Sequence, residues 1–217
     1  GFFVRRSGVL LTCCHVISRF EIDPQARIRL AYSRNIQVET TSGLYTAVIA
    51  HDQNSTHPVF EDYAVLKIDT NGMQYLPLGE YNGVETGDSV MVLGYPFGVS
   101  YPCATLGMIS AKHRSPSHIN RVVNLDMIQV DGSVNPGNSG GPVIDVDSSS
   151  VVGIVSVRLG SIERNIQNLK AFPEVRTSPI FSEIVNAFEG INTFLNPGIG
   201  QAVSIGYARA ELGRLGI

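Results

Sequence analysis

Residues 137–141 read Gly137-Asn138-Ser139-Gly140-Gly141, and this stretch decides which fold we expect for the chain. Glycines on both sides of a serine permit a tight turn with unusual backbone angles. Such a turn exposes the hydroxyl and directs the backbone amides of Gly137 and Ser139 toward one point. Taken alone, the same five residues are also compatible with an ordinary glycine-rich hairpin turn.

The order of the histidines limits the enzyme classes that this serine can serve. The pattern Gly-x-Ser-x-Gly also occurs in α/β-hydrolases, where the catalytic histidine follows the serine in the chain. Here every histidine precedes Ser139, namely His15, His51, His57, His113 and His118. The α/β-hydrolase arrangement is therefore excluded.

A serine hydroxyl becomes a good nucleophile when a histidine takes its proton and a carboxylate orients that histidine. His15 ends the apolar run LLTCC, and Asp62 immediately precedes the run YAVLKI. Taken singly, His15 is compatible with a strand-end residue and Asp62 with a turn residue. Together with Ser139 they give the chain order His, Asp, Ser of chymotrypsin-type enzymes.

The remaining pattern predicts an all-β protein. Of the 217 residues, 43% are hydrophobic and 16% charged, which is enough apolar material for one or two compact cores. Short β-branched runs separated by Gly, Pro and Asn are typical of strands in a sandwich or barrel. The expected strands are residues 8–12, 45–50, 63–68, 89–94, 122–125 and 151–157.

One segment has helical rather than strand periodicity. Apolar residues recur at three- and four-residue spacing within 178–195, with Ser178 as a suitable N-cap and Pro179 at the first helical position. The end of the chain, residues 208–215, predicts a second short helix.

These motifs resemble the trypsin-like (chymotrypsin-fold) serine peptidases, and most closely the protease domain of the HtrA/Deg family. The resemblance covers residues 1–159 and 202–217, and no PDZ domain accompanies it. The matching stretches are 11–17 (LTCCHVI), 62–68 (DYAVLKI), 94–98 (GYPFG), 105–110 (TLGMIS), 128–141 (IQVDGSVNPGNSGG) and 204–208 (SIGYA).

The resemblance implies two six-stranded antiparallel β-barrels, an N-terminal one over 1–83 and a C-terminal one over 84–217 with an insertion at 160–201. It makes His15 the general base, Asp62 its orienting acid and Ser139 the nucleophile. The oxyanion hole is expected at Gly137, Asn138 and Ser139, formed by the amides of the first and last. Because Asn138 stands where digestive trypsins carry Asp, we do not expect activation by insertion of a new N-terminus.

The same resemblance predicts the specificity pocket. The expected lining residues are Ser133, Val134, Ser156, Val157, Arg158 and Ile205. Ser133 in place of an acid disfavours cleavage after Lys or Arg, and the apolar neighbours favour a small or medium aliphatic P1 residue. Ser156 is also expected to support Asp62, while Arg158 leaves open a preference for an acidic residue.

Composition narrows the partners and the compartment. The net charge of −3 gives no reason to expect nucleic acid or membrane partners. The three cysteines, Cys13, Cys14 and Cys103, predict free thiols and a cytoplasmic protein. The run of Cys13, Cys14 and His15 alternates faces along a strand, so we expect no metal site and no cofactor.

Two functional alternatives stay open. The first is a protease-like module that binds partners without cutting, and the second is a regulatory protease within a longer polypeptide, which the missing initiator Met favours. The expected partner is a protein or peptide substrate. The insertion 160–201 is interpreted as a lid, a docking face for a regulatory domain or partner, or a packed decoration.

Overall fold

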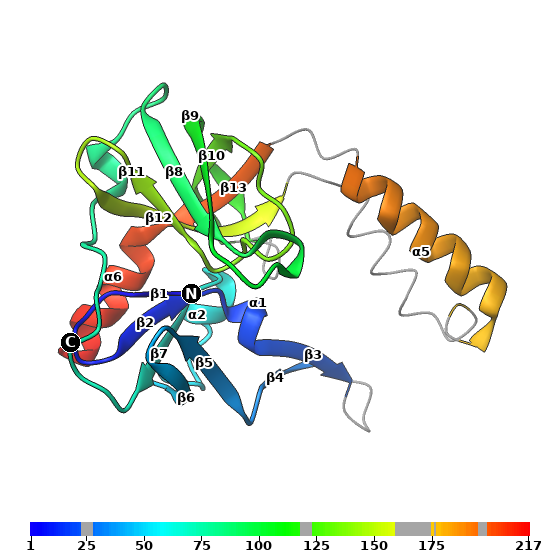
Figure 1. The fold of residues 1–217 in the computed structure, drawn as a ribbon, viewed down its shortest axis with the longest axis horizontal. Coiled ribbons are helices and arrows are strands. Elements are labelled where there is room, and N and C mark those ends of the chain that lie inside the picture. Colours follow the sequence, from blue (N-terminus) through cyan, green and yellow to red (C-terminus); the bar gives the residue numbers. More distant parts are fainter. Residues whose placement is uncertain (23–27, 118–122, 159–174, 176, 195–198) are drawn as a thin grey trace.

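The computed structural model describes residues 1–22, 28–117, 123–158, 175, 177–194 and 199–217. Figure 1 shows two β-structured halves, with the C-terminal helix lying beside both and one long helix extending away from them. No helix in the described ranges is long and apolar enough to cross a membrane.

The first half is an antiparallel sheet with strand order β1-β2-β7-β6-β5, accompanied by a separate hairpin of β3 and β4. All four residues of β2 are buried, which explains its unbroken apolar sequence VLLT. Its strands are β1 (Phe2–Phe3), β2 (Val9–Thr12), β3 (Ser18–Ile22), β4 (Ile28–Tyr32), β5 (Ile36–Thr40), β6 (Gly43–Ile49) and β7 (Ala64–Ile68). Two single-turn helices, α1 (Cys14–Ile17) and α2 (His57–Phe60), precede β3 and β7.

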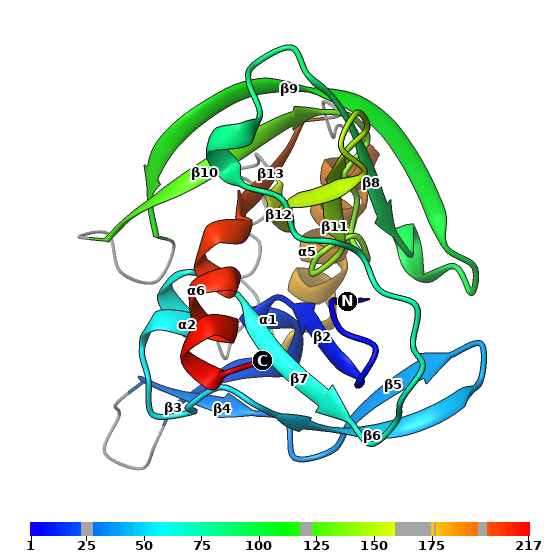
Figure 2. The ribbon, with the colours of Figure 1, turned by 90° about the vertical axis from the view of Figure 1, so that its left-hand side faces the viewer.

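The second half is a closed barrel in which every strand pairs with two neighbours, in the order β10-β13-β12-β11-β8-β9. Its strands are β8 (Ser89–Gly94), β9 (Cys103–Pro116), β10 (Asn124–Asp131), β11 (Pro142–Asp145), β12 (Ser150–Arg158) and β13 (Ile199–Ser204). Short 3-10 turns lie at Tyr81–Gly83 and Pro96–Gly98. Figure 2 shows this barrel stacked on the first half, with α6 running between them.

The two halves share one apolar core. Val4, Leu11 and Tyr63 of the first half pack in the same buried cluster as Ile154 and Val203 of the barrel. The C-terminal helix α6 (Ile205–Leu215) adds a polar tie, because the buried Tyr63 hydroxyl donates to Glu211 Oε2 at 3.2 Å. The two halves therefore pack against each other through this core and through α6.

The all-β prediction is confirmed, and so is the helix of the insertion, observed as α5 (Pro179–Phe194). The amide of Phe181 donates to the predicted cap, Ser178 Oγ, at 3.5 Å. The first half departs from a closed six-stranded barrel, since β3 and β4 leave the sheet directly after α1 and pair only with each other in the described residues. The predicted boundary at 83/84 falls between β7 and β8.

Candidate active site

His15 and Asp62 form the hydrogen-bonded pair at the centre of the site. His15 lies in α1, directly after β2, and Asp62 lies between α2 and β7. The imidazole Nδ1 is 2.8 Å from Asp62 Oδ2 and 3.0 Å from Oδ1, and the His15 amide donates to Oδ1 at 3.1 Å. With Nδ1–H directed to the carboxylate, Nε2 is the nitrogen available to accept a proton.

Asp62 has an unusual backbone conformation, and its side chain accepts a hydrogen bond from the other half of the molecule. Its φ of 48° lies in the left-handed region that non-glycine residues seldom occupy. Its Oδ2 accepts a hydrogen bond from Ser156 Oγ, a buried hydroxyl on β12. The structure thus brings three predicted residues, His15, Asp62 and Ser156, into one chain of hydrogen bonds across the two halves.

Ser139 directly follows a tight turn, and the residue types in that turn are those that its conformation requires. Asn138 N donates to Asn135 O at 3.0 Å, which closes a four-residue turn with Pro136 at its second position and Gly137 at its third. Gly137 has φ of 99°, as the third position of a type II turn requires. A Cβ at Gly137 would also collide with Tyr95 O, so glycine is needed twice over.

Some backbone amides of this turn donate hydrogen bonds within the described chain, and two do not. Those of Asn138, Gly140 and Gly141 donate to the carbonyls of Asn135, Val155 and Asn138. Within the described residues, no group accepts from the amides of Gly137 and Ser139. Two free amides flanking one residue are the donor pair that an oxyanion hole needs.

Asn138, predicted within the oxyanion segment, uses its own amide inside the turn. Its side chain is buried, with Nδ2 donating to Ser133 O at 3.4 Å. Within the described residues Asn138 Oδ1 has no partner. Asn138 therefore shapes the turn from inside, and its two neighbours carry the amides that are unpaired in the described part of the chain.

Gly140, the residue after Ser139, packs against the segment that precedes His15. A Cβ at Gly140 would collide with Thr12 Oγ1 and lie 3.0 Å from Cys13 N. Gly140 N and Cys13 Sγ both donate to Val155 O, at 2.8 and 3.0 Å. This contact holds Gly140, the residue after Ser139, against Thr12 and Cys13, which precede His15 by three and two residues.

Cys13 is the neighbour of the site that sequence reasoning missed. Its thiol is fully buried, and burial raises its pKa well above the ordinary value. The ligand atoms of Cys13, His15 and Asp62 all lie within 4.8 Å of one another. Cys14 points elsewhere, with Sγ 3.6 Å from Ser18 Oγ and 3.9 Å from Tyr32 OH. No local signal predicts this, because the chain turns helical at Cys14 and strand alternation does not relate residues 13 and 15.

The residues predicted for the specificity pocket do not all reach it. Ser133 is exposed and Val134 is buried against Gly200. Ile205 is fully buried in the core, so its assignment to an open pocket is wrong. The reason is that the chain turns helical there, with Gly206 N donating to the cap Ser204 Oγ at 3.1 Å. The side chains of Val157 and Arg158 lie outside the described residues.

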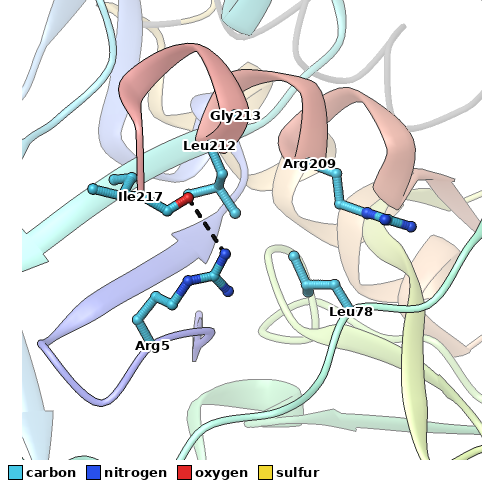
Figure 3. Close-up of a pocket in the computed structure, with 6 residues that line it drawn as sticks. All are labelled: Arg5, Leu78, Arg209, Leu212, Gly213 and Ile217. Atoms are coloured by element: carbon cyan, nitrogen blue, oxygen red, sulfur yellow. Dashed lines mark hydrogen bonds between the residues drawn. The ribbon is translucent and has the colours of Figure 1, made fainter.

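One cavity, of about 330 Å³, lies beside α6 and the C-terminal residue. Figure 3 shows its lining, with the guanidinium of Arg5 donating to Ile217 O at 3.3 Å. Arg209, Leu78, Leu212 and Gly213 complete the wall. It contains none of the residues of the site described above and offers no nucleophile or base, so we do not assign the substrate to it.

Comparison with known proteins places the chain in a family. Residues 1–154 match the family described as trypsin-like peptidase domain, and the chain belongs to it. A protein of Hahella chejuensis named "Probable periplasmic serine endoprotease DegP-like" is 35% identical over 72% of this chain and 29% of its own length. A Chlamydia pneumoniae protein of the same name is 33% identical over 90% of this chain and 36% of its length. The chain thus spans about a third of these relatives.

Solved structures agree with that assignment. A structure described as "HtrA-type protease AlgW with decapeptide" is 27% identical, with a TM-score of 0.64 over 98% of this chain and 50% of that chain. The active form of the Rv3671c protease from M. tuberculosis superposes with a TM-score of 0.65 over 99% of this chain and 72% of that one. At 21% identity, the latter likeness shows the fold alone.

The prediction of a cytoplasmic protein is wrong, because the relatives are named periplasmic endoproteases. The error came from treating unpaired cysteines as a sign of a reducing compartment. All three are free, but Cys13 and Cys14 are buried. A buried thiol is protected from oxidants, so its free state does not report the compartment.

Proposed function

We propose that the chain is the catalytic domain of a serine endopeptidase of the HtrA/DegP type, which hydrolyses peptide bonds through an acyl-enzyme on Ser139. Two observed features together support the proposal. One is the hydrogen-bonded series from Ser156 through Asp62 to His15, and the other is the pair of free amides at Gly137 and Ser139.

The residues divide the chemistry as follows. His15 Nε2 takes the Ser139 proton as Oγ attacks the peptide carbonyl, while Asp62 stabilises the imidazolium that forms. The amides of Gly137 and Ser139 donate to the oxygen that becomes negative in the tetrahedral intermediate. His15 then returns the proton to the leaving amine, and a water molecule, activated by the same nitrogen, hydrolyses the acyl-enzyme.

The proposed substrate is a protein or peptide with a small or medium aliphatic P1 residue. Ser133 in place of an acid speaks against cleavage after Lys or Arg, which supports an apolar preference. The AlgW protease is described with a decapeptide, which supports a peptide ligand for this fold. We further propose a periplasmic location from the names of the relatives.

The insertion is proposed to serve regulation rather than chemistry. Figure 1 shows α5 extending away from the barrel that carries Ser139. On this helix Ile180, Phe181 and Ile184 are exposed, whereas Val185 is buried. An apolar face left open in this way favours a lid or docking role over a packed decoration.

Digestion of an unfolded protein substrate tests the proposed function. The wild-type chain is expected to cleave β-casein, and mass spectrometry of the products is expected to place Val, Ala or Leu before the cut bonds. Ser139→Ala, checked for folding by thermal denaturation, should lose the activity. A folded wild-type chain that leaves casein intact would instead favour the silent binding module, and cleavage mainly after Lys or Arg would overturn the predicted pocket.

A further inference from the structure

A thiol, an imidazole and a carboxylate converge where the catalytic pair lies. Cys13 directly precedes helix α1, His15 lies in that helix, and Asp62 lies just before β7. Their ligand atoms all lie within 4.8 Å of one another. Catalysis uses the imidazole and the carboxylate but gives the Cys13 thiol no role.

This donor set has the composition of a zinc site. Zn²⁺ binds thiolate sulfur at about 2.3 Å and imidazole nitrogen or carboxylate oxygen at about 2.0–2.2 Å, in tetrahedral geometry. Three such bonds bring the ligand atoms to roughly 3–4 Å from one another, close to their present spread. Thiolate and imidazole together also favour zinc over the oxygen-seeking Mg²⁺ and Ca²⁺.

The three donors differ in access in a way that permits entry of an ion. The His15 side chain is 47% exposed and the Asp62 side chain 15%, whereas Cys13 is fully buried behind them. An ion therefore approaches from the exposed imidazole side and must displace the imidazole from Asp62 to reach the thiol. Val155 O loses the Cys13 donor in this step but keeps the hydrogen bond from Gly140 N.

We propose that Cys13 Sγ, His15 Nδ1 and the Asp62 carboxylate form an inhibitory Zn²⁺ site that is built into the catalytic centre. Binding forms three coordination bonds; the thiol proton passes to solvent, and the imidazole proton moves from Nδ1 to Nε2. Water fills the fourth position. The inhibition, though not the binding, rests on the proposed peptidase function.

Inhibition follows from which nitrogen the ion takes. With Nδ1 bound to zinc, the imidazole no longer donates to Asp62, and the Asp62 carboxylate no longer stabilises an imidazolium. Ser139 keeps its turn and its two amides, because neither contacts the ion. Zinc therefore removes the base and leaves the rest of the site in place.

The binding test uses the Ser139→Ala variant, so that its result does not depend on peptidase activity. Co²⁺, which takes zinc sites and absorbs in the near ultraviolet when bound to thiolate, is titrated into Ser139→Ala. We expect a saturable thiolate-to-cobalt band that Zn²⁺ abolishes by competition. The band should vanish in Ser139→Ala/Cys13→Ala and persist when Cys14 or Cys103 is changed to Ala instead. No band, or a band that survives the loss of Cys13, would overturn the proposal.

The functional test compares each enzyme with its own metal-free rate. Zn²⁺ is expected to inhibit casein cleavage by the wild type. Cys13→Ala should need at least roughly tenfold more zinc for the same inhibition, since even the loss of an outer-shell partner lowers metal affinity by about that factor. Mg²⁺ should not inhibit. Equal zinc inhibition of wild type and Cys13→Ala would overturn the proposal. If the wild type is inactive but the cobalt band is still observed, only the peptidase function is refuted.

Discussion

The two sides of the active site are held by different kinds of interaction. On the base side, His15 and Asp62 are fixed through side chains, namely the imidazole, the carboxylate and the Ser156 hydroxyl. On the nucleophile side, the turn before Ser139 is fixed through backbone, by a Pro-Gly turn and three amide hydrogen bonds. We therefore expect side-chain substitutions on the base side to reduce activity by different amounts. On the nucleophile side, we expect a single added methyl group to destabilise the fold.

Both sides depend on the same stretch of β12. Val155 O accepts from Gly140 and Cys13, and the next residue, Ser156, donates to Asp62. Two adjacent residues of the barrel therefore set the position of the nucleophile turn and of the acid. This explains how chain segments from separate sheets are kept in register although the base and the nucleophile lie on different halves.

The largest effect is expected on the base side, from Asp62→Asn. Asn tolerates the left-handed backbone of residue 62, so the fold should survive. The amide stabilises the wrong tautomer of His15 and cannot stabilise its cation, so kcat/KM should fall by about 10⁴. Steady-state kinetics with a peptide substrate measure this. A decrease below roughly tenfold would mean that Asp62 does not orient the base.

The second effect tests the backbone side. Gly140→Ala combines a φ of 78° with collisions against Thr12 and Cys13, so the free energy of unfolding should fall by about 3 kcal/mol or more. Gly98→Ala is the matched control, because its φ is 72° but nothing lies within 4 Å of the added Cβ. It should cost about 1–2 kcal/mol. Urea unfolding measures both, and equal losses would show that the close contact does not matter.

A smaller loss is expected when the acid loses its support from the barrel. Ser156→Ala removes the hydroxyl that donates to Asp62 Oδ2, a bond to a charged acceptor worth about 1.5–3 kcal/mol. We expect kcat/KM to fall roughly tenfold or more with KM little changed. Ser110→Ala, whose hydroxyl donates to Gln129 O elsewhere on the barrel, is the control and should keep full activity. Matching rates for the two variants would contradict the assigned role of Ser156.

The smallest effect concerns a buried histidine behind the base side. His51 Nδ1 accepts from Val65 N at 3.1 Å, and burial lowers the pKa of His51 from 6.5. Tyr32 and Tyr63 pack on the ring, and Asp52 and Glu211 partly oppose the shift.

Because the unfolded chain binds the proton first, stability conferred by neutral His51 should decline as pH falls below about 6.5. His51→Gln is expected to unfold more easily at neutral pH but to lose less stability between pH 7 and 5. Urea unfolding at several pH values measures this, and parallel pH profiles for the two proteins would rule out the assignment.

Much of this architecture could be predicted from the residues themselves. Motifs with rigid local demands, such as Pro136-Gly137 before Ser139, reveal their turn because few other residues tolerate it. The helix α5 was predictable because its cap Ser178 and its periodicity are local signals. The strand β2 was found because burial of all four residues leaves a largely apolar run, and β7 because only Lys67 interrupts its buried apolar residues.

Other features depend on contacts that no local pattern encodes. Ile205 was misplaced because whether Ser204 ends a strand or caps a helix is decided by packing of α6 against both halves. The place of Cys13 beside Asp62 depends on β2 pairing with β7, with Thr12 opposite Ala64, although these strands are far apart in the chain. The strand β5 alternates polar and apolar residues and lies at the sheet edge, so its signal is weak.

The most direct test of the proposed mechanism is the site of covalent labelling by a fluorophosphonate. We predict a single adduct on the wild-type chain, located at Ser139 by peptide mapping, absent in Ser139→Ala and formed far more slowly in His15→Ala. An adduct at another residue, or labelling of His15→Ala at the wild-type rate, would contradict the claim that His15 activates Ser139.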